Sequence, residues 1–261
     1  MRRRNVSTTL HMDGQALLSE PPLVRTWGAD GNPLPSRVIR APSRPRAHPL
    51  GVEAPPWFPT GPVGVPFDFC GYVRRLCADI VVRCDALWHV DVSRLLFAVT
   101  QARTGRAHGL QARVTPLRFR DGHLTRRGRG RAYQVQRYFV GEREMLYVVT
   151  FCLPRFMDQD FDDKFITIFH ELYHISPAFD GDLRRHEGRC SIHSRSKRGY
   201  DARMADLARA YLAGGANPAL HDFLRLNFTQ LQHRHGSVLG VMVPRPKLIP
   251  VPARRKGRGG R

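Results

Sequence analysis

MLYVVTFCLPRFMDQDFDDKFITIFHELYH, residues 145–174, holds the two strongest structural signals of the chain. Residues 145–153 are apolar or β-branched almost throughout and stop at Pro154, which predicts a buried strand. Residues 160–175 then carry apolar side chains at helical spacing, with acidic residues in the first turn and Pro177 just beyond the end. We therefore expect a strand followed directly by a helix.

Weaker signals surround this pair. Helical spacing of apolar side chains predicts further helices over residues 67–84, 202–212 and 219–231. Short apolar or alternating runs predict a strand over residues 92–100, a weaker one within 106–119, and either a strand or a short helix over 132–140. Glycines predict turns at 121–122 and 127–130. This mixture predicts an α+β fold in which a small mixed sheet packs on the helix of residues 160–175.

The two ends of the chain differ in composition from the middle. Residues 1–65 are rich in Pro, Gly and Arg and lack apolar periodicity, which predicts a largely disordered arm. Residues 233–261 predict an extended segment and a disordered basic tail, with His233-Arg234-His235 exposed to solvent. The packed domain is therefore expected over residues 66–232.

The charge of the chain is strongly unbalanced. Lys and Arg number 42 against 22 Asp and Glu, a formal net charge of +20, and most of the excess is Arg. A guanidinium binds phosphate oxygens in a planar, bidentate way, so nucleic acid is a candidate partner through the basic ends. The alternative is an Arg-rich composition with solvated tails.

Cysteine usage and hydropathy bear on the compartment. Five cysteines without a closely spaced pair argue against a disulfide framework and favour a reducing compartment. Cys70, Cys77 and Cys84 recur every seven residues along one stripe of a helix, which predicts core positions rather than ligands of one metal. No apolar run has the length of a membrane span, and the N-terminus lacks an apolar signal core. We expect a cytoplasmic protein without a membrane partner.

His170, Glu171 and His174 form the pattern His-Glu-x-x-His inside the predicted helix. The two histidines are four residues apart, so both imidazoles project from one face and can hold one Zn²⁺. Glu171 can reach a metal-activated water and act as its general base while the metal polarises a scissile carbonyl. The pattern therefore favours a zinc-dependent hydrolase site. The alternative is an amphipathic helix with two ordinary histidines.

A catalytic zinc site needs a third protein ligand. The segment after the predicted helix contains four side chains of suitable chemistry, which are His186, Glu187, Cys190 and His193. We favour His186, because a turn at Gly181 can bring the chain back, and His193 is the alternative. Tyr200 is the candidate oxyanion donor, with Tyr211 as a second choice, although buried tyrosines more commonly serve packing.

Residues 79–215 resemble the phage metallopeptidase family, which is similar to other zincins, and more distantly to SprT-like proteases, in its His-Glu-Leu-x-His motif. The run 90–97 resembles the opening strand of that family, and the other matching positions are residues 170–175, Pro177, Phe179, Gly181, Leu183, Arg184 and His186. The resemblance implies a minimal zincin-like domain and a peptidase acting on peptides or proteins. It implies that His170 and His174 bind zinc, that Glu171 is the base and that His186 is the third ligand.

Two other functions compete with this hypothesis. The net charge of +20 favours a basic, nucleic-acid-associated binding protein with a structural or inactive zinc site. The second competing function is that of an inactive zincin fold that is kept for contacts with other proteins. Glu171 argues against the latter, because a purely structural zinc site has no need of that carboxylate.

Overall fold

The computed structural model describes residues 23–28, 34–41, 60–102, 109–128, 130–185 and 197–251. Its centre is a mixed sheet in the order β4 (Leu95–Gln101), β10 (Tyr147–Leu153) and β5 (Ala112–Pro116). β4 runs parallel to β10, whereas β5 is antiparallel to it and forms an edge. The strand predicted at residues 145–153 is thus confirmed, and it is the middle strand of this sheet.

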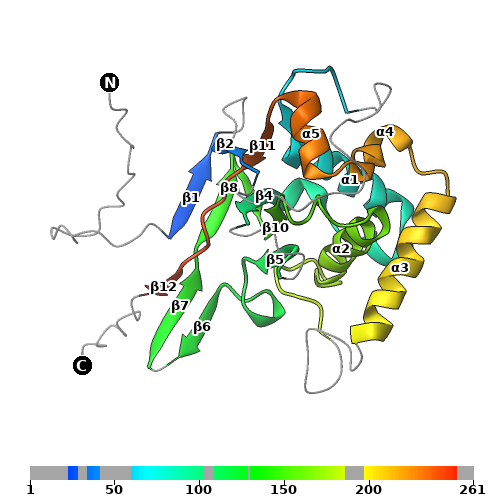
Figure 1. The fold of residues 1–261 in the computed structure, drawn as a ribbon. Coiled ribbons are helices and arrows are strands. Elements are labelled where there is room, and N and C mark those ends of the chain that lie inside the picture. The colour runs from blue at the N-terminus through cyan, green and yellow to red at the C-terminus, as the bar shows by residue number, and fades with distance from the viewer. Residues whose placement is uncertain are drawn as a thin grey trace, which may run out of the picture.

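Helices gather on one side of the molecule, as Figure 1 shows. They are α1 (Phe69–Arg83), α2 (Phe161–Tyr173), α3 (Lys197–Ala213), α4 (Pro218–His221) and α5 (Phe228–His235). Single turns of 3-10 helix lie at η1 (Asp85–Leu87), η2 (Val92–Arg94), η3 (Arg120–Gly122) and η4 (Asp222–Arg225). The predicted α+β class is confirmed. No helix among these described segments is long and apolar enough to cross a membrane.

The single helix predicted over residues 219–231 is wrong. The chain forms α4 and η4 and then starts again at α5, because Asn227 begins a new helix. The Asn227 side chain accepts the N–H of Gln230, and the Gln230 side chain accepts the N–H of Asn227. This reciprocal capping box satisfies two amide groups that a first turn leaves unpaired, so it fixes the break.

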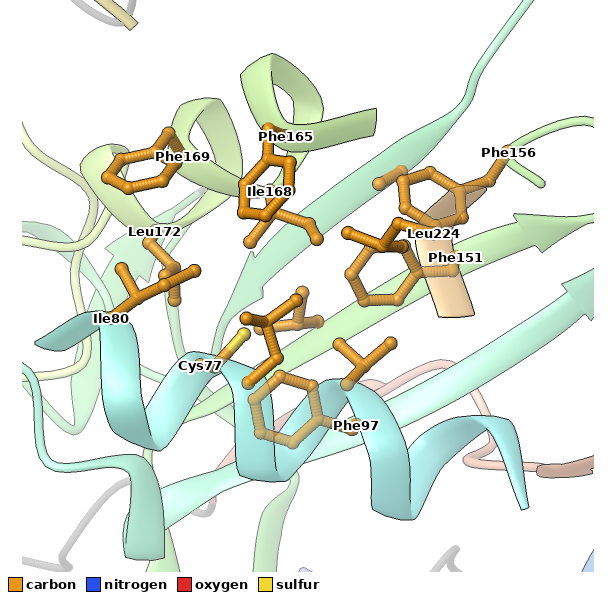
Figure 2. Close-up of a cluster of buried hydrophobic side chains, with 14 of the residues drawn as sticks. Cys77, Ile80, Phe97, Phe151, Phe156, Phe165, Ile168, Phe169, Leu172 and Leu224 are labelled. Carbon is orange, nitrogen blue, oxygen red and sulfur yellow. The ribbon is translucent and has the colours of Figure 1, made fainter. Parts of the chain in front are cut away.

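Side chains alternate along β4 and β10, so the central sheet has two apolar faces. One face carries Phe97 and Phe151 into the main core, where Figure 2 shows them meeting side chains of α1 and α2. The opposite face carries Leu96 and Val148 into a smaller cluster with Tyr138. Because both faces are buried, successive side chains of the strand are apolar, which explains the continuous apolar run over residues 145–153. Cys70, Cys77 and Cys84 are buried in the main core, as predicted.

Three small sheets surround the central one. They are β1 (Val24–Trp27) with β8 (Arg137–Val140) and β9 (Arg143–Met145), β2 (Ser36–Ile39) with β11 (Val238–Val241) and β3 (Phe67–Asp68), and β6 (Thr125–Gly128) with β7 (Arg131–Val135) and β12 (Leu248–Val251). β1 and β2 lie within residues 1–65, where the sequence predicts a largely disordered arm. Each pairs with a strand more than 100 positions later. Most of the rest of that arm lies outside the described residues.

A buried lysine joins α2 to the chain before α5. Lys164 is 2% exposed, and its ammonium donates to the carbonyl oxygens of Leu224 at 2.8 Å and Leu226 at 2.9 Å. Burial lowers the pKa of Lys164 to about 7, against the opposing effect of Asp158 and Asp160. The two hydrogen bonds satisfy carbonyls that the interrupted helix leaves without a helical partner.

His235 was predicted to be solvated, and that prediction is wrong. The imidazole is 2% exposed and makes two hydrogen bonds at the end of α5. Its Nδ1 lies 2.9 Å from the Val65 carbonyl oxygen and its Nε2 lies 2.8 Å from Thr60 Oγ1. A carbonyl can only accept, so Nδ1–H donates to Val65. In the neutral ring Nε2 then accepts from the hydroxyl of Thr60, which itself accepts from Arg234 Nε. Burial of the imidazole favours this neutral form. Its neighbour His233 is exposed, as predicted.

This network predicts that acid weakens the fold. Burial lowers the pKa of His235 below 6.5, and the charge of Arg234 lowers it further, while the Val65 carbonyl opposes both. As pH falls below about 6.5, the unfolded chain therefore binds the proton first and the free energy of unfolding decreases. Urea denaturation between pH 5 and 8 should show a smaller pH dependence in His235→Gln than in the wild type. His233→Gln should keep the wild-type dependence, and equal dependence in all three proteins would contradict the assignment.

Candidate metal centre

The helix α2 brings His170 and His174 together, as their four-residue spacing predicts. The two Nε2 atoms lie 2.9 Å apart, and the ring centroids are 4.5 Å apart with the planes nearly perpendicular. Phe165, Ile168 and Leu172 hold the apolar stripe of the same helix in the main core. This packing fixes the rotation of α2 about its axis, so the direction of both imidazoles is set by the core.

Glu171 is held between α2 and the edge of the central sheet. Its Oε2 accepts the backbone N–H of Val114 on β5 at 2.6 Å, and the side chain is buried. Burial raises the pKa of Glu171 to about 7, although the Val114 hydrogen bond and the nearby Arg113 oppose this effect. A carboxylate with a raised pKa, on the residue that follows His170, has the chemistry of a proton acceptor.

The chain turns tightly at Gly181 and returns to the end of α2. This turn was predicted from the sequence. Gly181 has φ +89°, and a Cβ there would meet the side chain of Arg118 at 2.5 Å, so glycine is needed on both counts. Beyond it, Leu183 bridges to Ile175, and the Arg184 N–H donates to the His174 carbonyl at 2.6 Å. The backbone therefore runs beside the histidine-bearing end of the helix up to residue 185.

Tyr200 on α3 packs against both histidines. Its ring centroid lies 4.9 Å from that of His170 and 5.7 Å from that of His174, on which it stacks. The phenol is buried, and burial raises its pKa. The predicted tyrosine thus lies at the site, and its role as oxyanion donor stays a prediction. Tyr211, the second choice, instead donates its hydroxyl to Asp79 at 2.7 Å.

Asp201 is a candidate site residue that the sequence analysis missed. Its carboxylate lies 3.7 Å from Nδ1 of His170, on the side of the ring away from His174. This distance is longer than a hydrogen bond, so the carboxylate would have to move closer to fix the tautomer of His170 and make its ligating nitrogen more basic. Asp201 follows Tyr200 at the start of α3, so one turn of this helix supplies two side chains to the site.

Arginines border the site beside Tyr173. The Arg184 guanidinium lies 4.0 Å from the centroid of the Tyr173 ring, and that of Arg203 lies 4.9 Å from it. Arg184 also donates from Nε to the Tyr173 carbonyl at 2.8 Å. Burial lowers the pKa of Arg184, and Arg203 contributes to the lowering. The approach to the site from this side is therefore electropositive.

The spacing of the two imidazoles is compatible with a zinc ion. Two imidazole nitrogens on one tetrahedral Zn²⁺ are about 3.3 Å apart. The 2.9 Å between His170 and His174 needs only a small ring rotation to match. Within the described ranges, His, Cys, Asp and Glu form no group of three that could hold a metal ion. The four predicted candidates for the third ligand lie outside those ranges, and they are His186, Glu187, Cys190 and His193.

No protein-family model, no curated protein and no solved structure matches this chain. The resemblance to the phage metallopeptidase family and the zincin-like fold therefore stay predictions that rest on the motif. The geometry of the site has to carry the functional argument.

Proposed function

We propose that this protein is a zinc-dependent metallopeptidase whose site is centred on His170, Glu171 and His174. The observation that carries the proposal is the convergence of two imidazole nitrogens, 2.9 Å apart, with a buried carboxylate on the residue after the first. This arrangement supports hydrolysis. The choice of peptides as the substrate comes from the resemblance of residues 79–215 to a peptidase family.

In this proposal each residue has a defined task. His170 and His174 would hold the metal through Nε2, and His186 would be the third ligand, with His193 as the alternative. When bound, Zn²⁺ supplies Lewis acidity that polarises a carbonyl and acidifies water. Glu171 takes the proton of the attacking water and returns it to the leaving amine. The Tyr200 hydroxyl is the candidate donor to the developing oxyanion.

Metal binding tests the proposal directly. The wild-type protein should contain stoichiometric zinc by elemental analysis, and His170→Ala should lose it because one of the ligands is gone. Asp201→Asn should keep the fold but bind zinc about 10–100-fold more weakly in competition with a chelator. His233→Ala, which removes an exposed histidine from α5, is the matched control and should keep wild-type zinc. A metal-free wild-type protein would rule out the proposal.

The third ligand can be identified in the same experiment. His186→Ala and His193→Ala each remove one candidate imidazole. We expect His186→Ala to lose zinc and His193→Ala to retain it. The opposite pattern would assign the ligand to His193, and retention of zinc in both variants would direct attention to Glu187 or Cys190.

A further inference from the structure

Two arginines lie against the same aromatic ring beside the candidate metal centre. The guanidinium carbons of Arg184 and Arg203 are 4.0 and 4.9 Å from the centroid of the Tyr173 ring. Arg184 is partly buried and Arg203 is exposed, so solvent reaches both side chains. Each contact between a cation and the ring is favourable, but the two positive charges repel each other. The fold therefore holds a pair of like charges at this place.

Arg184 is oriented by acceptors that carry no charge. Its Nε donates to the Tyr173 carbonyl at 2.8 Å, and its Nη2 lies 3.5 Å from Nε2 of His89. A guanidinium only donates, so Nε2 of His89 is the acceptor of this contact, as in a neutral imidazole. Burial lowers the pKa of His89, and the charge of Arg184 lowers it further, which favours that neutral form. These contacts fix the guanidinium without neutralising its charge.

The two arginines have no carboxylate partner among the residues that the structure describes. Neither Arg184 nor Arg203 forms an ion pair with an Asp or Glu of those segments, and the charge that acts on Arg184 unfavourably is that of Arg203. The described acidic residues closest to the pair along the chain contact other basic side chains, and they are Asp182, Asp201 and Asp206. An anion from solution would remove the repulsion and add charge-assisted hydrogen bonds.

Tyr200 connects the arginine pair to the proposed metal ligands. Its ring centroid lies 5.7 Å from that of Tyr173 and 4.9 Å from that of His170. Arg203 follows Tyr200 by three residues on α3, so both side chains project from the same side of that helix. α3 packs beside α2, which carries the histidines (Figure 1). The pair therefore borders the candidate metal centre.

We propose that Arg184 and Arg203 bind a carboxylate of the peptide substrate and make the enzyme selective for acidic peptides. This inference rests on the proposed peptidase function, which supplies the peptide. In an unmodified peptide the carboxylates are the side chains of Asp and Glu and the free C-terminus, and guanidinium groups match them in geometry and charge. An extended chain advances about 3.3–3.6 Å per residue, so the recognised carboxylate belongs to a residue within about three positions of the cleaved bond.

The test measures which peptides the protein retains, so it does not require hydrolysis. Immobilised full-length Glu171→Gln protein is incubated with a mixed peptide library, and the retained peptides are identified by mass spectrometry. A salt concentration of about 150 mM screens the long-range attraction between a basic protein and acidic peptides. One library has free C-termini and a second has amidated C-termini. Acid-dependent retention in both libraries assigns the carboxylate to side chains, and retention that needs the free end assigns it to the C-terminus.

Reversing one charge of the pair gives the sharpest comparison. In the Glu171→Gln background, Arg203→Glu should lower the retention of peptides that carry the recognised carboxylate at least about tenfold relative to neutral ones. It should enrich peptides with Lys or Arg instead, which a loss of folding cannot produce. Arg74→Glu reverses an exposed charge on α1 and is the matched control, which should change the same ratio less than about twofold. Arg184→Gln should also lower the ratio, and thermal denaturation shows whether this variant folds.

Two results would overturn the inference. One is equal retention of acidic and neutral peptides by the Glu171→Gln protein, without dependence on the free C-terminus. The other is an equal change of preference in Arg203→Glu and Arg74→Glu. A preference that Arg203→Glu reverses, in a protein whose wild type holds no zinc or cleaves no peptide, would support the carboxylate site and remove the peptidase assignment. Failure of the two proposals is therefore distinguishable.

Discussion

Replacing Glu171 with glutamine is expected to lower peptide hydrolysis by a factor of about 10²–10⁴, because an amide cannot accept the proton of the attacking water. Zinc content should not change, since the ligands remain. The fold should be retained as well, because the amide oxygen of glutamine can still accept the N–H of Val114 that now meets Glu171 Oε2 at 2.6 Å. Cleavage of a mixed peptide library, followed by mass spectrometry, measures the effect.

The matched control is Glu142→Gln, which changes an exposed carboxylate in the turn between β8 and β9. We expect it to cleave the library as the wild type does. If Glu171→Gln and the control were equally active while both held zinc, Glu171 would not be the general base. If the wild type held zinc but cleaved no peptide, the metal centre would stand and the peptidase assignment would fail.

The largest expected effect on stability comes from Phe151→Ala in the middle strand of the central sheet. Phe151 is 1% exposed, and its ring meets Phe69 and Phe156 edge to face at centroid distances of 5.5 and 4.8 Å. Truncation removes its buried apolar area and leaves a cavity between β10 and α1, at a cost of about 3–5 kcal/mol. Urea denaturation measures the change in the free energy of unfolding.

Val82→Ala is the control for this measurement. Val82 lies on α1 but is 84% exposed, so its truncation should change the free energy of unfolding by no more than about 0.5 kcal/mol. A loss below about 1 kcal/mol for Phe151→Ala would mean that Phe151 does not pack against Phe156 as in Figure 2.

The sequence predicted the elements that carry a clear local pattern of apolar side chains. β10 and α2 follow from an apolar run and from helical spacing, and the cysteine stripe of α1 follows from its seven-residue repeat. β1 and β2 have no comparable pattern, because they are four-residue strands whose pairing partners are far away in the chain. Their positions depend on pairing with β8 and β11, and no local signal specifies that pairing.

The sequence analysis did not predict the contacts of Lys164, Asp201 and His235. Only for Lys164 did the sequence contain a sign of its position. Lys164 stands four residues before Ile168 and eight before Leu172, so the sequence did place a cation on the apolar stripe of α2. Asp201 and His235 gave no such signal, because the nitrogen near Asp201 lies 31 positions earlier in the chain and Thr60 lies 175 positions before His235. Contacts of this kind arise only when the whole chain has folded.

The hydrogen bond from Val114 to Glu171 has a consequence for association between molecules. β5 is an edge strand, and in its register with β10 the N–H of Val114 points outward, where the strand of another chain could pair. The Glu171 carboxylate occupies that donor, and Pro116, two residues along, has none to offer. The same side chain therefore takes up an outward-pointing donor of the edge strand, so that this donor is not available for intermolecular strand pairing. Replacing it with an apolar residue would be expected to cost solubility as well as chemistry.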